Sequence, residues 1–329
     1  MKAATVFPNG LLVTGSEGFV GSGLCAHLAA QRDLSRPQAI ALDLTRPEHF
    51  DRLPRGCRVR AVFHLAVRGR VLVARREMSA HCADTIDAAV NVLELLNPGV
   101  FIFSSSCAVY GDTRETGARP SQSGYRPRGV YALSKIAVEL IAAQWAAANR
   151  RAAVIFRFGN VVGTGCGGLI RYLTRHALQY PQGEKPAQLR GAGRIVRDYV
   201  PLHYVTQVLS AAADHRWKPG STTILNMGTG RGLTNAAVAA RMKRELANHG
   251  YELNVAWDPE PAPEEAMVSM LDVSRTGRLF GIPPASPQAV WDAIDEAVRG
   301  HLEDARADAE THPPGRCRDA ALPPSRLSV

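Results

Sequence analysis

Long apolar stretches are missing from this chain of 329 residues. No run of about 18 apolar residues occurs, so we expect no segment to span a bilayer. The N-terminus shows no cleavage-site pattern, and we therefore expect no signal peptide. The six cysteines are scattered without C-x-x-C spacing. The scattered positions of the cysteines disfavour a zinc site or any other bound metal, and they disfavour a disulfide framework. They favour a reducing cytoplasmic location.

Lysine is also scarce, with only five in the chain, although lysine and arginine together number 39 against 30 acidic residues. The resulting net charge of +9 is carried almost entirely by dispersed arginines. There is no basic block and no interleaving of aromatic with basic residues, so nucleic-acid binding is not expected. Small anionic substrates are a better explanation of the charge.

What the sequence does contain is an alternation of short apolar runs with helical periodicity. The pattern predicts strands at 10–14, 38–44, 59–66, 100–104 and 153–158, and helices at 21–31, 80–97 and 131–150. Such alternation predicts a doubly wound α/β fold, with a parallel sheet covered by helices on both faces. The predicted nucleotide-binding domain is 1–163, with 198–227 returning to it. A smaller α/β lobe is predicted at 164–305, and a disordered tail at 306–329.

A glycine-rich turn follows the first predicted strand. Gly15, Gly18 and Gly21 form the pattern G-x-x-G-x-x-G and lead directly into a predicted helix. Glycines let the backbone approach a pyrophosphate closely, and the helix N-terminus supplies N–H donors to it. The pattern therefore favours a dinucleotide site over a mere tight turn.

An acidic residue that binds the adenosine ribose is expected about 20 residues further on. Asp43 lies 22 residues after Gly21, at the end of a predicted strand. It could instead cap the following turn. Because Arg32, Arg36 and Arg46 are nearby, NADP stays open as an alternative to NAD.

Tyr131 and Lys135 form the pattern Y-x-x-x-K at the start of a predicted helix. The spacing of four residues places both side chains on one helical face. An ammonium beside a phenol favours the phenolate, so we expect a lowered pKa for Tyr131 and a role as general acid or base. Lys135 could also hold a ribose hydroxyl.

Three serines, Ser104 to Ser106, follow a predicted buried strand. The carboxyl ends of strands are where doubly wound sheets place their ligand sites. A hydroxyl there could bind a reacting oxygen. For Ser104 and Ser105 we expect the structural role of satisfying backbone groups.

Seven motifs in order resemble those of one family. They are TGSEGFVG (14–21), VFHLA (62–66), FSSSCAVYG (103–111), YALSK (131–135), FRFGNVVG (156–163), GAGRIVRDYV (191–200) and LDVSRTGRLFGI (271–282). Together they resemble the extended short-chain dehydrogenase/reductases, in particular the NAD-dependent nucleotide-sugar epimerase/dehydratase branch with a Rossmann domain. The resemblance covers roughly residues 10–300.

The resemblance implies a role for each matching position. Ser106, Tyr131 and Lys135 would be catalytic, and Ser106, Asn160 and Arg197 would bind a nucleotide-diphosphate sugar. A guanidinium fork suits a diphosphate. The residues expected at the NAD cofactor are Gly15, Gly18, Phe19, Val20, Gly21, Asp43, Leu44, Leu65, Ala66, Tyr131 and Lys135. A homodimer is also expected.

Departures from the family pattern narrow the reaction. Cys107 and Ala108 stand where dehydratases of the family carry an Asp-Glu pair, which leaves redox chemistry at a carbinol carbon. The neutral pattern most resembles UDP-hexose 4-epimerases, while a nucleotide-sugar 4-ketoreductase is the alternative. A non-enzymatic nucleotide-sensing relative would usually lack the tyrosine or the lysine. Ala262 stands where a second phosphate-binding arginine is usual.

One further departure concerns the cofactor. The stretch between Gly21 and Val62 is shorter than is typical of the family, which leaves the loss of a strand open. In that case Asp43 and Leu44 would lie on the adenine side instead of at the ribose.

Overall fold

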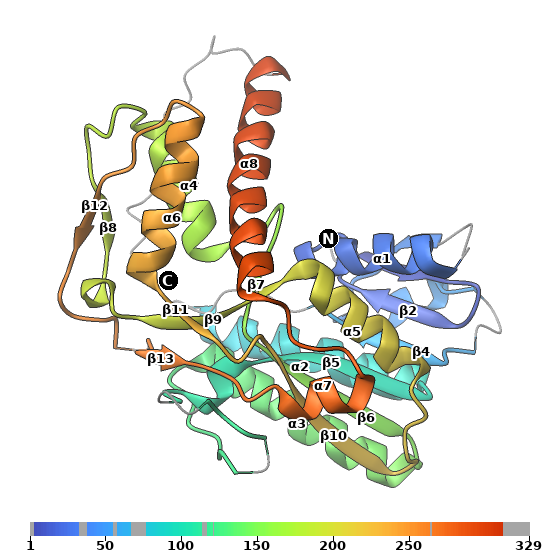
Figure 1. The fold of residues 1–329 in the computed structure, drawn as a ribbon. Helices are drawn as coiled ribbons and strands as arrows, with labels where there is room; N and C mark the ends of the chain where they lie inside the picture. The colour runs from blue at the N-terminus through green and yellow to red at the C-terminus, as the bar shows by residue number, and fades with distance from the viewer. Residues whose placement is uncertain are drawn as a thin grey trace.

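The structure, a computed structural model, describes residues 3–32, 38–54, 58–66, 77–113, 117–120, 122–263 and 265–311. Its centre is a seven-stranded sheet with the strand order β10-β6-β5-β4-β2-β1-β3 (Figure 1). The strands are β1 (Ala3–Val6), β2 (Leu11–Thr14), β3 (Gln38–Ala41), β4 (Ala61–His64), β5 (Val100–Ser106), β6 (Ala152–Phe158) and β10 (Ser221–Met227). From β2 to β10 along this order, all neighbouring strands are parallel. The predicted doubly wound α/β fold is confirmed.

Helices cover both faces of the sheet. They are α1 (Phe19–Arg32), α2 (Met78–Leu96), α3 (Val130–Asn149), α5 (Leu202–Asp214) and α7 (Ser274–Phe280). Side chains of α2 and α3 form one apolar core with one face of the sheet, and side chains of α1 and α5 form a second core with the other face. The central strands therefore have apolar side chains on both sides, which explains their unbroken apolar runs.

The N-terminal strand β1 is a feature that the predicted strands do not include. It pairs antiparallel with β2 on one side and with β3 on the other. A tight turn connects β1 to β2, in which the amide of Phe7 donates to the carbonyl of Leu11 and Gly10 has a φ of +76°. The predicted parallel sheet therefore contains one antiparallel strand, β1, near this edge.

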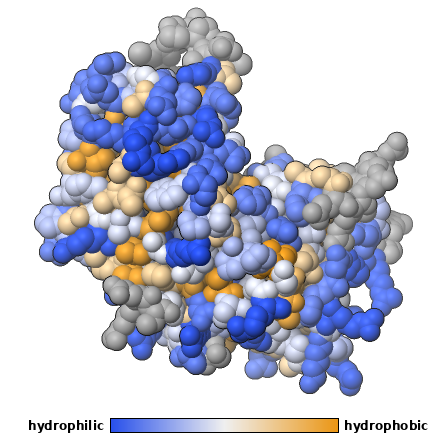
Figure 2. Space-filling view, viewed as in Figure 1, coloured by the Kyte–Doolittle hydropathy of each residue, from blue (hydrophilic) through white to orange (hydrophobic). Residues whose placement is uncertain are grey.

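A second lobe lies beside the sheet. It contains the strands β7 (Asn160–Val162), β8 (Ala187–Leu189), β9 (Val196–Pro201), β11 (Gly232–Thr234), β12 (Val255–Trp257) and β13 (Val268–Ser269), and the helices α4 (Gly168–Gln179), α6 (Asn235–Asn248) and α8 (Pro287–Thr311). β9 is the centre of a small sheet that includes β7, β11 and β13. In the space-filling view, hydrophilic residues dominate the outer surface of this lobe, and the outline is notched between the lobes (Figure 2).

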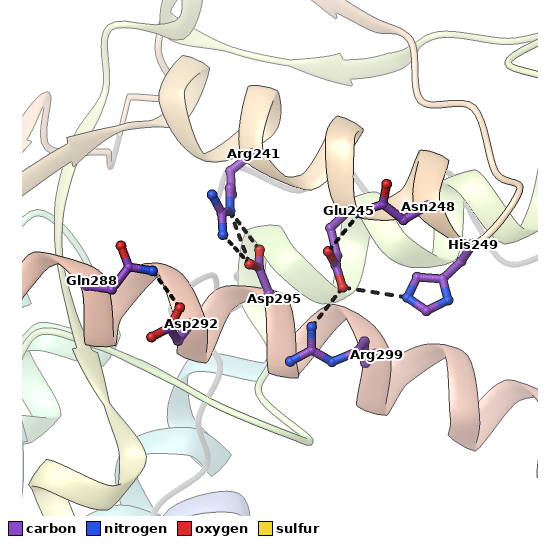
Figure 3. Close-up of polar contacts among 8 residues, drawn as sticks. All are labelled: Arg241, Glu245, Asn248, His249, Gln288, Asp292, Asp295 and Arg299. Carbon is purple, nitrogen blue, oxygen red and sulfur yellow. Dashed lines mark hydrogen bonds and ion pairs between the residues drawn. The ribbon is translucent and has the colours of Figure 1, made fainter.

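Ion pairs join α6 to α8, with the arginines partly exposed and the carboxylates largely buried (Figure 3). Arg241 donates from Nε to Asp295 at 2.9 Å, and Arg299 donates to Glu245 at 2.9 Å. Apolar residues of both helices and of α4 form the core of the lobe. These contacts fix α8 as the side wall of the lobe.

The predicted start of a disordered tail at 306 is wrong. α8 continues through Thr311, because alanine, arginine and glutamate favour a helix even where no apolar face is needed. Residues 312–329 lie outside the described residues. The predicted domain limits also need a change at 198–201, since these residues belong to β9, whereas 202–227 form α5, the connection and β10.

Among the described residues, α3 is long and apolar enough to cross a membrane by length and composition. The core helix of a soluble protein passes the same test. Lys135 and Glu139 interrupt its apolar run, and both are buried against the sheet. On its outer face Leu133 and Leu140 are about half exposed.

The expected homodimer stays a prediction.

Candidate functional site

The carboxyl end of β5 holds the first predicted catalytic residue. Ser106 is the last residue of β5 and caps the short 3-10 helix η3 (Cys107–Tyr110). Its hydroxyl accepts a hydrogen bond from the amide of Ala108 at 3.2 Å. This hydroxyl also lies close enough to the phenol of Tyr131 to lower the pKa of that phenol, against the larger effect of burial. Ser106 and Tyr131, 25 positions apart in the sequence, therefore meet at the edge of the sheet.

Tyr131 and Lys135 occupy the first turns of α3. The ammonium of Lys135 lies 5.6 Å from the centroid of the Tyr131 ring and 4.9 Å from that of Phe103. It donates to the carbonyl of Ser104 on β5. This contact fixes the start of α3 against the end of β5, and the structure thereby brings Ser106, Tyr131 and Lys135 together.

The electrostatics of this group differ from the expectation. Burial raises the pKa of Tyr131 to about 12, although the nearby Ser106 hydroxyl acts in the opposite direction. Burial also lowers the pKa of Lys135 to about 7, while the nearby Glu139 carboxylate partly opposes the change. The expectation of a lowered pKa for Tyr131 is therefore wrong in this structure, because desolvation of the phenol is the largest effect on it.

Glu139 is a buried residue at the site that the motifs did not single out. It accepts hydrogen bonds from the Tyr125 hydroxyl at 2.8 Å and from Arg157 at 3.0 and 2.6 Å. The hydroxyl of Ser105 donates to it as well. The sequence spacing could have identified Glu139, because it lies four residues after Lys135 and so on the same helical face.

Ser104 satisfies a backbone group as expected, whereas the expectation is wrong for Ser105, whose hydroxyl binds a side-chain carboxylate. The Ser104 hydroxyl donates to the carbonyl of His64 at 3.2 Å, and the Ser105 hydroxyl is bound by Glu139. Ser106 is the member of the trio whose hydroxyl faces Tyr131.

The glycine-rich loop lies between β2 and α1, at the same edge of the sheet. Gly15 has a φ of +70°, and a Cβ there would lie 2.8 Å from the backbone of Ala66. A Cβ at Gly21 would lie 2.0 Å from the carbonyl oxygen of Gly15. Both positions therefore require glycine for the backbone itself. The loop ends at Phe19, where α1 begins, so the first amides of the helix point toward the edge where a pyrophosphate would bind.

The residues expected around this loop are in different environments. Ala66 lies at the end of β4, and its amide donates to Thr14 at 3.4 Å. Val20 and Leu65 are partly buried beside the core of α1 and α5. Leu44 is buried in the opposite core. These positions, like the catalytic and substrate roles, stay predictions.

The arrangement fits an extended dinucleotide. At the edge of the sheet that holds the glycine loop, β2 has β4 and β5 on one side and β1 and β3 on the other. Neighbouring strands are about 4.8 Å apart, so the glycine loop is about 10 Å from Ser106. A pyrophosphate at the loop would allow the nicotinamide to reach Ser106 and Tyr131 and would direct the adenosine toward β1 and β3.

The predicted substrate residues lie on neighbouring strands of the small sheet. Asn160 begins β7 and pairs with Tyr199 of β9, two residues from Arg197. Arg197 is buried, donates to Glu265 at 2.8 Å and donates to the carbonyl of Ala266 at 2.8 Å. The guanidinium expected to meet a diphosphate is thus already paired with a carboxylate inside the lobe.

Within the described residues, no group of three or more histidine, cysteine, aspartate and glutamate side chains could hold a metal ion. Burial raises the pKa of the Cys107 thiol, which lies beside Ser106. This thiol is therefore protonated at neutral pH and is a poor base.

Comparisons with known proteins were made on the sequence and on the structure. A family model described as the NAD dependent epimerase/dehydratase family matches residues 11–228. A UDP-glucose 4-epimerase of Azospirillum brasilense is 28% identical over 327 residues, covering 89% of this chain and 90% of the relative. A GDP-6-deoxy-D-mannose reductase of Pseudomonas aeruginosa is 31% identical over 216 residues, covering 61% of this chain and 68% of the relative.

Solved structures share the fold. A UDP-glucose 4-epimerase of Thermotoga maritima with UDP-glucose has a TM-score of 0.76 at 22% identity, covering 90% of this chain and 99% of that chain. The structure of RMD from Pseudomonas aeruginosa with NADPH has a TM-score of 0.74 at 22% identity, covering 89% and 97%.

Proposed function

Because the chain belongs to the NAD-dependent epimerase/dehydratase family, we propose that it epimerises a nucleotide-diphosphate sugar through a transient keto intermediate. The observation that carries the proposal is the meeting of Ser106, Tyr131 and Lys135 at the edge that also holds the glycine loop. The similarity to the Azospirillum UDP-glucose 4-epimerase, which covers 89% of this chain, supports the substrate class.

The residues at the site have distinct tasks in this proposal. Bound nicotinamide would supply the acceptor and donor of hydride. Tyr131 exchanges a proton with the sugar hydroxyl at its phenolic oxygen, and Ser106 holds that same sugar oxygen by a hydrogen bond. Lys135, when protonated, stabilises the phenolate form of Tyr131. With a pKa of about 12 the resting phenol is protonated, which suits the reducing half-reaction, in which it donates a proton to a developing alkoxide. The oxidising half-reaction that begins epimerisation needs the phenolate to accept the proton of the sugar hydroxyl, and protonated Lys135 is the group that would stabilise it.

The same residues argue against dehydration of the sugar. Removal of water next to a ketone needs an acid and a base near the carbon that loses the hydroxyl. Cys107 is buried and protonated, and Ala108 has no titratable group. The proposal therefore stops at redox chemistry on one carbinol carbon.

The alternative is reduction of a 4-keto nucleotide sugar by NAD(P)H. The position of Asp43 favours it, because Asp43 follows β3, two strands away from the glycine loop. An NADPH-consuming enzyme does not need the ribose carboxylate that is typical of NAD enzymes. The similarity to the GDP-6-deoxy-D-mannose reductase supports the same alternative.

Labelled substrate separates the two reactions. The purified protein is incubated with UDP-galactose deuterated at C4, and the product is analysed by mass spectrometry and NMR. Epimerisation gives UDP-glucose that retains the deuterium, with no net change in nicotinamide absorbance. Stoichiometric loss of NAD(P)H with a 4-keto nucleotide sugar, without turnover of UDP-galactose or other UDP- and GDP-hexoses, would favour the reductase. Tyr131→Phe is the inactive control for either result.

A further inference from the structure

A cavity of about 380 Å³ lies beside β10, the outermost strand at one end of the central sheet. Its lining includes Arg119 ahead of α3, Asp272 ahead of α7, and Arg275 and Arg278 on α7. The glycine loop follows β2, which is four strands from β10, so it lies about 19 Å away across the sheet. No described lining residue belongs to the predicted catalytic, cofactor or substrate residues. The cavity is therefore a separate place, and its volume is in the range of small-molecule sites.

Backbone hydrogen bonds hold the two walls of this cavity together. The amide of Ala118 donates to the carbonyl of Met270 at 2.9 Å, and the amide of Asp272 donates to the carbonyl of Ala118 at 3.0 Å. The buried side chain of Asn226 donates to the carbonyls of Ala118 and Asp272, at 2.7 and 2.9 Å. Gly117 has a φ of +72°, and a Cβ there would lie 3.1 Å from the backbone of Asp272. The walls are thus fixed by the fold before any ligand binds.

Positive charge is in excess in this cavity. Asp272 is the one acidic residue among its described lining residues, and its carboxylate accepts from Nε of Arg119 at 2.7 Å. Arg275 donates to the carbonyl of Ile224 at 3.4 Å. Within the described part of the chain, no ion pair joins Arg275 or Arg278 to a carboxylate, and both residues are exposed. Three arginines against one aspartate therefore leave two positive charges to be matched.

From this cavity and its charge we infer a second anion site, in which Arg275 and Arg278 bind the phosphate group of a small molecule. The two arginines are three residues apart on α7, a spacing that places them on one face of the helix. A guanidinium matches phosphate oxygens with two parallel hydrogen bonds. A phosphate ester carries a charge of about −2 at neutral pH, which equals the excess in the cavity.

Titration of inorganic phosphate into the full chain tests the site without any sugar substrate. Binding is followed by calorimetry and by the melting temperature, with saturating NAD present to occupy the glycine loop. We expect saturable binding with a Kd of about 1 mM or below, and a rise in melting temperature with phosphate concentration. Absence of saturable binding up to about 10 mM would overturn the inference. The result does not depend on whether the protein epimerises a sugar, so the two proposals fail separately.

Variants assign the bound phosphate to this cavity. The double variant Arg275→Gln, Arg278→Gln removes both charges at exposed positions, and we expect it to weaken phosphate binding about tenfold or more. Arg244→Gln, at an exposed position of α6, is the matched control and should leave the Kd within about twofold. An unchanged Kd in the double variant, or an equal loss in the control, would overturn the inference.

Succinate tests the chemical class of the ligand, because it has the same charge as the phosphate dianion without its tetrahedral oxygens. We expect succinate to bind about tenfold more weakly than phosphate. Binding of equal strength would show that the cavity selects charge alone, and the assignment to phosphate would be wrong.

Discussion

Burial of Lys135 predicts a measurable dependence of stability on pH. The lysine is 3% exposed, and its pKa falls from 10.5 to about 7 in the folded protein. Below pH 7 the lysine is charged in both states, so the folded state carries the full desolvation cost. Above pH 7 the folded lysine is neutral while the unfolded lysine still binds a proton. The unfolded state then binds more protons, and the free energy of unfolding rises with pH.

The size of this effect follows from the same pKa values. Each pKa unit corresponds to about 1.4 kcal/mol, so the free energy of unfolding gains about 2 kcal/mol between pH 7 and pH 9. The variant Lys135→Met keeps the length of the side chain and removes the titrating group. We expect it to be more stable than the unchanged protein at pH 7, and the difference to shrink by about 2 kcal/mol at pH 9.

Urea denaturation followed by circular dichroism at pH 7, 8 and 9 measures both proteins. Comparison of the two cancels the groups that they share, such as Cys25, Cys107 and Cys166, whose pKa values burial raises. If the free energies of unfolding of the two proteins change in parallel with pH, the lysine is not desolvated as the structure describes. That result would also contradict a pKa of about 7 for Lys135.

The remaining predictions concern the phenol, the loop and the buried ion pair. Tyr131→Phe should lower kcat by about 10²- to 10⁴-fold with cofactor affinity retained, as measured by kinetics and calorimetry; activity within a few-fold of the unchanged protein would contradict the role. Gly18→Val should fold, because a Cβ at Gly18 meets only the Gly15 carbonyl oxygen, at 3.1 Å. It should lose dinucleotide affinity in calorimetry, because the added side chain blocks the approach of a pyrophosphate to the backbone. Glu265→Gln should release the charge of Arg197 and lower KM for a UDP-sugar several-fold at constant kcat, whereas an unchanged KM would show that no diphosphate meets this arginine.

The parallel part of the fold could be predicted because its strands have a recognisable sequence pattern. Strands buried on both faces are apolar without alternation, and the glycine pattern marks the first turn between strand and helix. The site residues Ser106, Tyr131 and Lys135 could be proposed from motifs in the same way. Their pKa values could not, because desolvation depends on which side chains cover α3, and the motif alone does not contain that information.

The N-terminal hairpin shows a different limit. Asn9-Gly10 is a strong turn signal between two short apolar runs, so the hairpin itself was readable from the sequence. The position of this hairpin in the sheet could not be predicted from the sequence, since either face and either edge could accept a short apolar strand. The placement of β1 between β2 and β3 moves Asp43 one strand further from the glycine loop than its spacing from Gly21 suggests.

The pairing of Arg197 with Glu265 lies beyond sequence reasoning for a related reason. The two residues are 68 positions apart and come from different segments of the second lobe. Glu265 is 7% exposed, and its oxygen Oε2 has no hydrogen-bond partner among the described residues. Burial accordingly raises the pKa of this carboxyl, while the charge of Arg197 opposes the rise. A substrate diphosphate that binds here must displace or protonate Glu265, because two anionic groups cannot share one guanidinium without cost. If the substrate diphosphate meets Arg197 as proposed, we therefore expect the strength of its binding to depend on Glu265 as much as on the arginine that the motif identifies.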